Sequence, residues 1–398
     1  MSLNTGSTFT GYDPLNPEHH SDPAALLERS RSQCPVAHPY ENMLVVTRMD
    51  DVRDILVDNE TYSARSNFVL DPAIGARGSM PVRPITTLDP PEHGQVRQLL
   101  RRWMAPKELA KLEPRIRDLV TADLDEIDDR DTVDVLTVAK KLAAQVVYAL
   151  LGMPEQDWDR LQGWTDAIHE RLPFSLDDMS EFLAMVAYLD RLIAEQMALP
   201  KPDARTILGG LSLCAAGGGL TAVDVRIHLW QLITAGTETT SSLITNLLYE
   251  LLLDRSRWQR LLDDRSLIHA AVEESLRHDT PIQFVMRTPH EDTQIAGCPV
   301  TPGQQVVLYL QSANWDQQTW GKNAAEYDMT RRDVASHVAF GKGPHACLGA
   351  PIARLEARVL LEELLRRYPD MTLAPEYEWA PTPELMVRRP TGLKVRLR

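Results

Sequence analysis

The chain has 398 residues, of which 43% are hydrophobic, so it is long enough to bury a substantial core. Its formal net charge of −14 disfavours nucleic acid as a partner, because nucleic-acid binding requires a basic surface. The four cysteines are scattered, without paired metal-ligand spacing or a dense disulfide framework, which favours a reducing compartment.

The N-terminal segment, residues 1–35, is polar and interrupted by prolines. It lacks the basic start and apolar run of a signal peptide. No stretch of the chain reaches the roughly 18 apolar residues that a membrane span requires. We therefore expect a cytoplasmic protein that does not associate with a membrane.

Helical periodicity dominates the middle of the chain, where apolar residues recur at spacings of three and four. This pattern predicts amphipathic helices over residues 108–128, 133–152, 155–171 and 178–198. Gly217-Gly218-Gly219 is a helix breaker. Beyond it, Thr221 and Asp224 have the spacing of a capping box, which predicts the start of one long helix of roughly 30 residues.

Strand signals are short and lie near the two ends of the chain, at Met43–Thr47, Val306–Leu310 and Leu393–Leu397. The expected fold class is therefore mainly α with small β-sheets. We expect a single domain over residues 1–398, because the motifs between residues 89 and 349 serve one site. No flavin or iron–sulfur domain is expected after the last strand.

The segment Phe340–Gly349, Phe-Gly-Lys-Gly-Pro-His-Ala-Cys-Leu-Gly, carries the strongest chemical signal. Its three glycines let the backbone turn tightly and approach a flat object closely. Cys347 comes directly before a helical pattern, where the helix dipole favours a thiolate. A loop of this design can hold the sulfur against a metal; a buried structural cysteine is the alternative.

This segment matches every fixed position of Phe-Gly-x-Gly-x-His-x-Cys-x-Gly, the haem-binding pattern of the cytochromes P-450, and the chain resembles that family from about Asp13 to Leu397. The resemblance implies one haem domain, with haem b between a long central helix and the helix after the cysteine loop. It also implies that Cys347 ligates the iron and that Phe340, Gly341 and Gly349 shape the loop.

Within the long helix, Ala235-Gly236-Thr237-Glu238-Thr239-Thr240 is polar where an apolar helix should continue. A glycine followed by hydroxyl side chains can open the helix locally and leave room for water. The segment resembles the family's oxygen-activation motif. This implies that Thr239 and Glu238 are catalytic and supply protons for cleavage of the O–O bond, with Ala235 against the haem. Ordinary surface Thr and Glu side chains are the alternative.

Haem propionates need cations, and the arginine fork matches a carboxylate. Asp89-Pro90-Pro91-Glu92-His93 followed by Arg97 resembles the family's segment on the propionate side. The resemblance implies that His93, Arg97, Arg287 and His345 anchor the propionates. Each of these side chains, taken alone, could instead be solvated.

Glu274 and Arg277 match the family's Glu-x-x-Arg pair, and Arg331 matches its third member, so the resemblance implies a structural lock beside the haem. The spacing alone is a weak signal. Glu28 with Arg31 and Glu363 with Arg366 share it, and such pairs are usually surface salt bridges.

The substrate pocket is expected to come from the loop Arg65–Ile85 and from three further segments of the chain. The expected lining residues are Phe68, Val69, Ile74, Met80, Leu232, Ile282, Gln283, Phe284, Val285 and Met386. Their mainly apolar character suits a small to medium, largely apolar organic substrate. Gln283, and Arg77 or Arg83, are candidates to fix a polar group; aromatic, terpenoid and polyketide substrates all stay open.

The resemblance implies a monomeric monooxygenase that inserts one oxygen atom of O2 by hydroxylation or O-dealkylation. Its electrons would come from a separate 2Fe–2S ferredoxin and an NAD(P)H-dependent reductase. Basic residues in the segments expected around the cysteine could steer such an acidic donor, although solvated helix faces are the alternative. They are Arg97, Arg101, Arg102, Lys107, Lys342, Arg354 and Arg358. A peroxygenase and a non-enzymatic haem sensor or recruitment protein are the rival functions, and the Glu238–Thr239 pair disfavours both.

Overall fold

The computed structural model describes residues 11–16, 18–33, 35–67, 83–171 and 179–398. The chain divides into two compact units. Unit 1 comprises Met1–Gln95, Glu273–Cys347 and Ala380–Arg389, and unit 2 comprises Val96–Val272, Leu348–Trp379 and Pro390–Arg398. The single haem domain expected from the sequence stays a prediction.

Unit 1 is built on a mixed five-stranded sheet with the strand order β1-β2-β8-β5-β3. The strands are β1 (Val36–Tyr40), β2 (Met43–Val46), β3 (Tyr62–Ser63), β5 (Phe284–Pro289) and β8 (Gln305–Tyr309). Strands β2 and β8 pair in parallel, with Val45 opposite Val307, and the other neighbours are antiparallel. Strands β2 and β8 are buried along their whole length, which explains why their sequences are continuous apolar runs without alternation.

Short helices and turns complete unit 1. They are α1 (Glu18–Ser21), α2 (Ala24–Gln33), α3 (Met49–Val57), α13 (Leu310–Asn314), α14 (Gln317–Trp320), the hairpin β6 (Thr293–Ile295) and β7 (Cys298–Val300), and the 3-10 turns η2 (Ile85–Thr87), η5 (Val334–Ser336) and η6 (Gly343–His345). Helix α3 buries Met49, Val52 and Leu56 in one cluster with Leu44 and Leu308 of the sheet. Their spacing of three and four residues places them on one face of α3.

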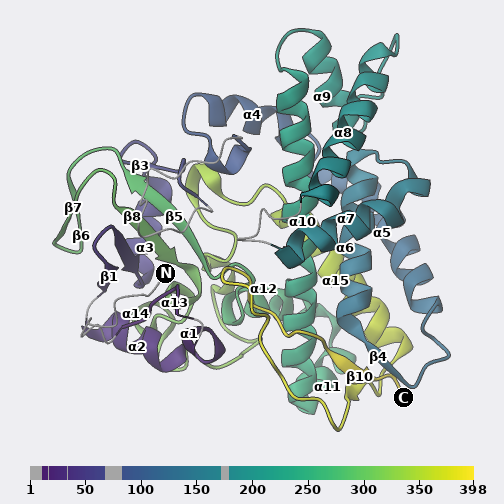
Figure 1. Cartoon of the computed structure of the whole chain (residues 1–398). Helices are drawn as coiled ribbons and strands as arrows, with labels where there is room; N and C mark the ends of the chain where they lie inside the picture. The colour runs from purple at the N-terminus through teal and green to yellow at the C-terminus, as the bar shows by residue number, and fades with distance from the viewer. Residues whose placement is uncertain (1–10, 17, 34, 68–82, 172–178) are drawn as a thin grey trace. The chain divides into compact units, whose positions relative to one another are not determined.

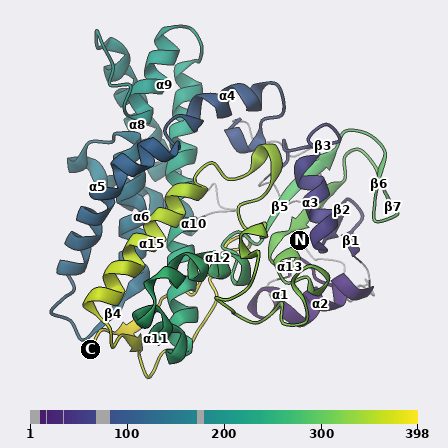
Figure 2. The same ribbon diagram turned by 180° about the vertical axis from the view of Figure 1, so that it is seen from behind.

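Unit 2 is a helical assembly around the long helix α10, which packs against α6, α7 and α8. Helices α6 and α8 lie beside α10 in both ribbon views (Figures 1 and 2). Its helices are α5 (Pro106–Asp125), α6 (Val135–Leu151), α7 (Trp158–Arg171), α8 (Ser180–Ala198), α9 (Ile207–Ala216), α10 (Ala222–Leu253), α11 (Arg255–Asp263) and α15 (Ala350–Arg367), with the 3-10 turns η3 (Glu155–Asp157) and η4 (Arg265–Leu267). Helices α4 (Glu92–Arg101) and α12 (Ile268–His278) each contain residues of both units. Unit 2 also contains a small sheet of β4 (Thr132–Asp134), β10 (Lys394–Arg396) and β9 (Thr372–Leu373), in that order.

The predicted mainly helical fold class is confirmed, and the predicted helices and strands occur with small shifts at their ends. The capping box of α10 forms: the Asp224 N–H donates to Thr221 Oγ1 at 3.1 Å, and the Thr221 N–H donates to Asp224 Oδ2 at 2.9 Å. The expected local opening at Gly236 is wrong, because α10 is helical throughout. A Cβ at Gly236 would lie 2.6 Å from Val147 Cγ2, so this glycine permits the close packing of α6.

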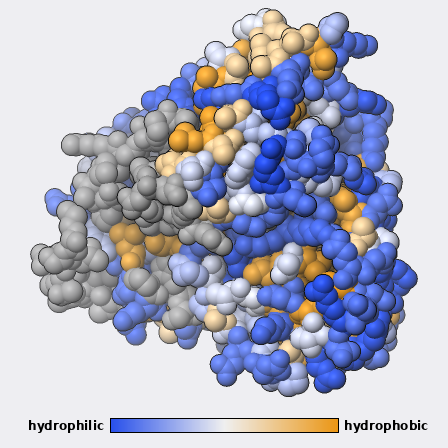
Figure 3. All heavy atoms as spheres, turned by 45° about the vertical axis from the view of Figure 1, so that its right-hand side comes forward, coloured by the Kyte–Doolittle hydropathy of each residue, from blue (hydrophilic) through white to orange (hydrophobic). Residues whose placement is uncertain are grey.

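Among the described residues, no helix is both long and apolar enough to cross a membrane. Figure 3 presents one face of the molecule, on which most described side chains are hydrophilic and the apolar ones form separate patches.

Helix α15 contains a buried carboxyl group, Glu356, which is 1% exposed. Its Oε2 accepts no hydrogen bond from the described residues, and burial raises the pKa of Glu356 well above its usual value. The folded state therefore holds a proton that the unfolded state releases, so stability falls as pH rises through the folded-state pKa.

We expect Glu356→Gln, which mimics the protonated acid, to raise the free energy of unfolding at pH 8 by about 1 kcal/mol or more. The gain should vanish below the ordinary pKa of glutamate, as urea denaturation at several pH values would reveal. Glu113→Gln should act in the opposite direction, because Arg117 and Arg358 lower the pKa of Glu113. A gain from Glu356→Gln that does not depend on pH would contradict this explanation.

Candidate active site

Cys347 ends a loop of unit 1 that two left-handed glycines shape. Gly341 has a φ of 66° and Gly343 a φ of 71°. A Cβ on Gly343 would lie 2.8 Å from the Cα of Val57, so a larger residue would clash as well as be strained. The Cys347 N–H donates to the Phe340 carbonyl oxygen at 2.7 Å and closes the loop. The loop thus presents an exposed thiol on a fixed backbone.

Gly349 differs from the other two glycines of the motif. It is the N-cap of α15, and its φ of −81° lies in a region open to every residue. The expectation that three glycines are needed for tight turning therefore holds at two positions only. Pro351 stands in the first turn of α15, where its fixed φ suits a helix start.

Unit 1 also holds the two histidines expected at the propionates. His93 in α4 stacks on His345 of η6, with ring centroids 3.9 Å apart and planes 30° apart. Arg97 follows His93 by one turn of α4, is half-buried and belongs to unit 2. The structure thus brings His93 and His345 into direct contact.

Arg287 in β5 is a buried cation, 4% exposed, whose Nη1 donates to the Met286 carbonyl oxygen at 2.8 Å. Burial lowers the pKa of Arg287 to about 10, an effect that the charge of Asp89 partly offsets. Among the described residues, no carboxylate forms an ion pair with Arg287. A buried guanidinium without a carboxylate is costly. An anionic group such as a haem propionate would satisfy it, so these residues fit that cofactor.

Asp89 fixes the segment that precedes α4. Its carboxylate accepts hydrogen bonds from Ser63 Oγ at 2.6 Å and from the Ala64 N–H at 2.9 Å, and Arg65 Nε lies 3.3 Å from it. A cis Pro90–Pro91 bond follows. The sequence motif includes Asp89 but gives no sign of these partners, which lie about 25 residues earlier.

Thr239, Ala235 and Leu232 form an open strip along α10 in unit 2. Most of this helix is buried, yet Ala235 is exposed and both Leu232 and Thr239 are half-buried. Spacings of three and four residues place them on one helical face. Thr239 Oγ1 donates to the Ala235 carbonyl oxygen at 2.7 Å. This open and largely apolar strip fits the flat face of a macrocycle.

Glu238 lies beside this strip but is buried, with 4% exposure, so the alternative of an ordinary surface glutamate is wrong. Lys140 Nζ from α6 and His169 Nδ1 from α7 both lie 3.8 Å from Glu238 Oε2. No local pattern predicts either partner, because both lie at least 69 residues away along the chain.

The structure brings Glu274, Arg277 and Arg331 together in the interior of unit 1. Arg277 binds Glu274 through two hydrogen bonds of 2.7 and 2.8 Å, and neither side chain is exposed to solvent. Arg331 Nε lies 3.3 Å from the same carboxylate. Arg277 also donates to the carbonyl oxygens of Asn314 and Ala324. This lock differs from the Glu28–Arg31 and Glu363–Arg366 pairs, in each of which one partner is largely exposed.

Two expected pocket residues are committed to the core of unit 1. Phe284 is fully buried and its ring lies 5.8 Å from that of Tyr309, so it packs in the core of unit 1, and its expected contact with substrate stays a prediction. Gln283 donates to the Thr280 carbonyl oxygen at 2.6 Å and accepts from the Tyr309 hydroxyl at 3.5 Å. Both ends of its amide thus have a partner within unit 1, and the expected bond to a polar substrate group stays a prediction. Strand alternation could not reveal this, because both faces of the sheet are covered.

The remaining pocket residues divide into two groups. Ile282, Val285 and Met386 are partly buried in unit 1 and Leu232 is partly buried in unit 2, so they can still line a pocket. Phe68, Val69, Ile74, Met80 and Arg77 lie outside the described residues. Arg83 is half exposed and pairs with Glu92 at 2.6 Å, so it has a carboxylate partner at the surface.

Comparison with known proteins identifies the family. The family model described as Cytochrome P-450 matches residues 177–396. The chain is 32% identical over 89% of its length to cytochrome P-450 130 of Mycobacterium tuberculosis, of which 90% is covered. It is also 32% identical over 89% of its length to erythromycin C-12 hydroxylase of Saccharopolyspora erythraea, of which 89% is covered.

A solved structure agrees with these relatives. The crystal structure of CYP109E1 from Bacillus megaterium in complex with testosterone has a TM-score of 0.83 and 29% sequence identity, covering 95% of this chain and 99% of that one. Such a likeness implies the family's cofactor, a haem whose iron is ligated by cysteine. The chain belongs to the cytochrome P-450 family and is a haem-thiolate monooxygenase.

Proposed function

We propose that this monooxygenase inserts one oxygen atom of O2 into a small to medium, largely apolar organic substrate, by hydroxylation or O-dealkylation. Cys347 is the proposed ligand of the haem iron. The observation that carries the proposal is the pair formed by Thr239 on the open strip of α10 and the buried, charge-partnered Glu238 beside it. A peroxygenase or a haem sensor would not need this pair.

The bound haem supplies the activation of O2 and the oxidation of the substrate C–H bond. Cys347 would hold the haem iron as a thiolate, a ligand whose electron density favours cleavage of the O–O bond. Arg287, Arg97, His93 and His345 would hold the propionates through charge-assisted hydrogen bonds. Their placement at the haem comes from the family resemblance, and the buried charge of Arg287 supports it.

Thr239 and Glu238 handle the protons. The Thr239 hydroxyl donates to the Ala235 carbonyl oxygen, so its oxygen lone pairs stay able to accept a hydrogen bond. Glu238 is the adjacent acid, and a carboxyl group in a buried site can pass a proton to a hydroxyl or a water. Together they can deliver the two protons that turn one atom of O2 into water.

The apolar character of the remaining candidate pocket residues supports the proposed substrate class. Leu232, Ile282, Val285 and Met386 are the described candidates that keep some exposure, and none of them has a polar side chain. One relative is named for hydroxylation of erythromycin and one similar structure holds testosterone, which supports testing macrolides and steroids.

An optical titration tests the substrate class. The ferric holoenzyme would be titrated with steroids, macrolides, terpenes and aromatic acids, and the Soret band followed for a change of spin state. A saturable shift with an apolar compound is expected. Saturable shifts with aromatic acids alone would overturn the apolar assignment, because they would require a cation in the pocket.

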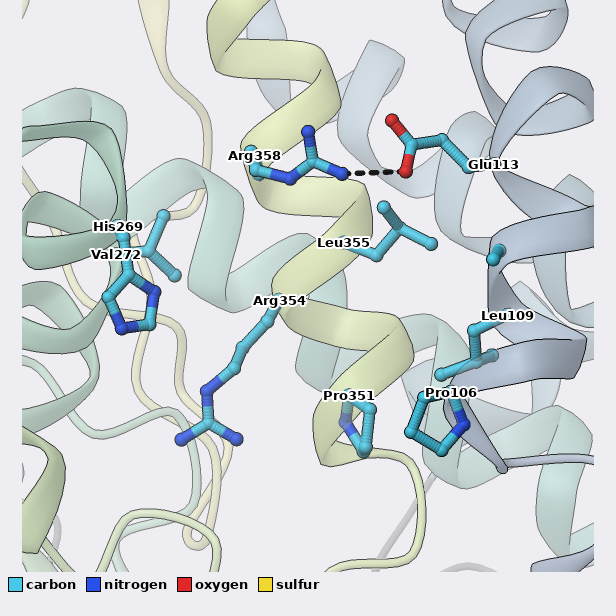
Figure 4. Close-up of a pocket in the computed structure, with 10 residues that line it drawn as sticks. Pro106, Leu109, Glu113, His269, Val272, Pro351, Arg354, Leu355 and Arg358 are labelled. Atoms are coloured by element: carbon cyan, nitrogen blue, oxygen red, sulfur yellow. Dashed lines mark hydrogen bonds and ion pairs between the residues drawn. The ribbon is translucent and has the colours of Figure 1, made fainter. Parts of the chain in front are cut away.

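We further propose an acidic 2Fe–2S ferredoxin, with an NAD(P)H-dependent reductase, as the electron donor. Unit 2 contains a groove of about 300 Å³ between α5, α12 and α15 (Figure 4). Pro106, Leu109, Val272 and Pro351 give it an apolar lining, and Arg354 adds a positive charge. Such a combination suits an acidic protein surface with an apolar centre.

Arg358 contributes less net positive charge to the basic patch than the sequence alone indicates. This guanidinium binds Glu113 at 2.8 Å and Glu362 at 3.0 Å, as Figure 4 shows for Glu113. Arg117 bridges the same two carboxylates. Because these charges neutralise one another, attraction of an acidic donor depends mainly on the other basic residues of the patch. They include the exposed Arg101, Arg102 and Lys107.

Arg354→Glu is expected to slow reduction by ferredoxin about tenfold at low salt, because it reverses a charge at the groove. The difference should shrink as salt screens the surface. Stopped-flow reduction over a salt series measures both effects. The control variant Arg366→Glu changes an exposed arginine in the last turn of α15, and ferredoxin should reduce it at the wild-type rate. Equal rates and equal salt dependence for both variants would contradict the docking proposal.

A further inference from the structure

Two helices of unit 2, α6 and α7, bring titratable groups to the carboxylate of Glu238 in α10. Lys140 from α6 and His169 from α7 each place a nitrogen 3.8 Å from Glu238 Oε2. Asp166 lies three residues before His169 and places Oδ1 3.8 Å from Lys140 Nζ. Gln162 Nε2 donates to Asp166 at 2.9 Å and orients it. The resulting cluster contains two acids, a lysine and a histidine.

The exposure of these side chains falls step by step toward Glu238. The exposed fraction of the side chain alone is 38% for Asp166, 27% for Lys140, 12% for His169 and 6% for Glu238, whose whole residue is 4% exposed. The cluster therefore reaches from the surface of unit 2 to the buried acid of α10. A purely structural ion pair between Glu238 and Lys140 would not require His169, a side chain of the type that titrates near neutral pH.

His169 has the chemistry of a proton carrier. Burial lowers the pKa of His169, with a smaller lowering from Lys140, while Glu238, Asp166 and a hydrogen bond with the Thr234 backbone act in the opposite direction. The ring is therefore mostly neutral at pH 7, and its protonated form is a stronger acid than an exposed imidazolium. Such a group takes a proton from water and releases it readily to a carboxylate.

We propose that His169 is a positioning residue for Glu238: it orients this carboxylate and restores its proton in each turnover. The inference rests on the proposed function. Glu238 loses a proton toward the water formed from O2, and an N–H proton of the His169 imidazolium then protonates the carboxylate through one water that spans the 3.8 Å between them. The neutral imidazole regains its proton from solvent water, so only N–H and O–H bonds change. Lys140 holds the carboxylate in place, and Asp166 balances the lysine charge.

The kinetic test compares His169→Gln with His228→Gln. His228 is a matched control, because it is a buried histidine of α10 whose pKa burial lowers to about 4. His169→Gln should form about tenfold less product per NAD(P)H oxidised, with unchanged haem content and substrate affinity. The solvent deuterium isotope effect of His169→Gln should be larger than that of the wild type. In the wild type, the product yield should increase as pH falls through the His169 pKa, and this increase should be absent from His169→Gln. The control should retain wild-type values.

A retained product yield, isotope effect and pH profile in His169→Gln would overturn the inference. If that variant does not fold, Lys140→Met supplies the second test, since loss of the cation should misorient Glu238 and also lower the product yield. A wild-type yield in Lys140→Met would overturn the proposed cluster.

A titration without turnover gives an independent readout. NMR of isotope-labelled histidine in the purified holoenzyme reports the His169 pKa directly. Glu238→Gln should lower this pKa further, because it removes the negative charge that raises it, and Lys140→Met should raise it. No change in either variant would overturn the contact. Absence of product from wild-type enzyme would instead be a failure of the proposed function, which this titration does not require.

Discussion

Replacing Cys347 with alanine is expected to abolish substrate turnover together with the thiolate-ligated haem spectrum. The Cys347 loop is held by the left-handed Gly341 and Gly343 and by the hydrogen bond to Phe340, so alanine should leave its backbone in place. What the variant loses is the thiolate donor, which raises the electron density needed for O–O cleavage. Absorption spectra of the purified variant and product analysis measure the two losses.

Cys298→Ala is the matched control, because Cys298 is a half-buried thiol in strand β7, an element that is not part of the cysteine loop. It should keep the haem spectrum and the turnover of the wild type. Cys347→His offers a nitrogen ligand and should restore haem binding at most, without normal turnover. Normal turnover by Cys347→Ala or Cys347→His would rule out Cys347 as the ligand.

Arg277→Met is expected to lower the free energy of unfolding by about 3–5 kcal/mol, the usual result of removing one partner of a buried ion pair. It leaves Glu274 without the two hydrogen bonds that Arg277 donates and also removes those to the Asn314 and Ala324 carbonyl oxygens. Urea denaturation, monitored by far-ultraviolet circular dichroism, measures the loss. Arg277→Lys should restore only part of the lost free energy of unfolding, because lysine cannot form a bidentate pair of hydrogen bonds with a carboxylate.

Arg366→Met is the matched control, because Arg366 pairs with Glu363 at the same sequence spacing. Its side chain is 64% exposed, so the change should stay within about 0.5 kcal/mol. Similar losses in Arg366→Met and Arg277→Met would show that sequence spacing, and not burial, sets the energy. That result would contradict the structural role assigned to the Glu274–Arg277 lock.

Local chemistry explains what could be predicted from the sequence. The Thr221–Asp224 capping box and the apolar spacing behind it specify α10, because both depend on residues within one or two turns. The apolar strands β2 and β8 and the two left-handed glycines of the cysteine loop also follow from local patterns. The Glu274–Arg277 pair needed the family resemblance, since its spacing alone matches surface pairs.

Packing between distant segments explains what could not be predicted. Lys140 and His169 reach Glu238 only after α6 and α7 pack on α10, and no sequence pattern links the three residues. Phe284 and Val285 are adjacent apolar residues of a covered strand, so periodicity could not decide which one is fully buried. The sequence around Gly236 is compatible with a local opening of the helix, whereas its contact with Val147 depends on the tertiary structure.

The most direct test of the central claim is the source of the oxygen atom in the product. The holoenzyme would be supplied with a substrate that shifts its Soret band, an acidic ferredoxin, reductase, NAD(P)H and isotopically labelled O2, and the product examined by mass spectrometry. Incorporation of one labelled atom per product molecule is the predicted result, with Glu238 and Thr239 supplying protons for the second atom. Product without label from O2, together with labelled product when labelled hydrogen peroxide replaces O2 and the electron donors, would contradict a monooxygenase.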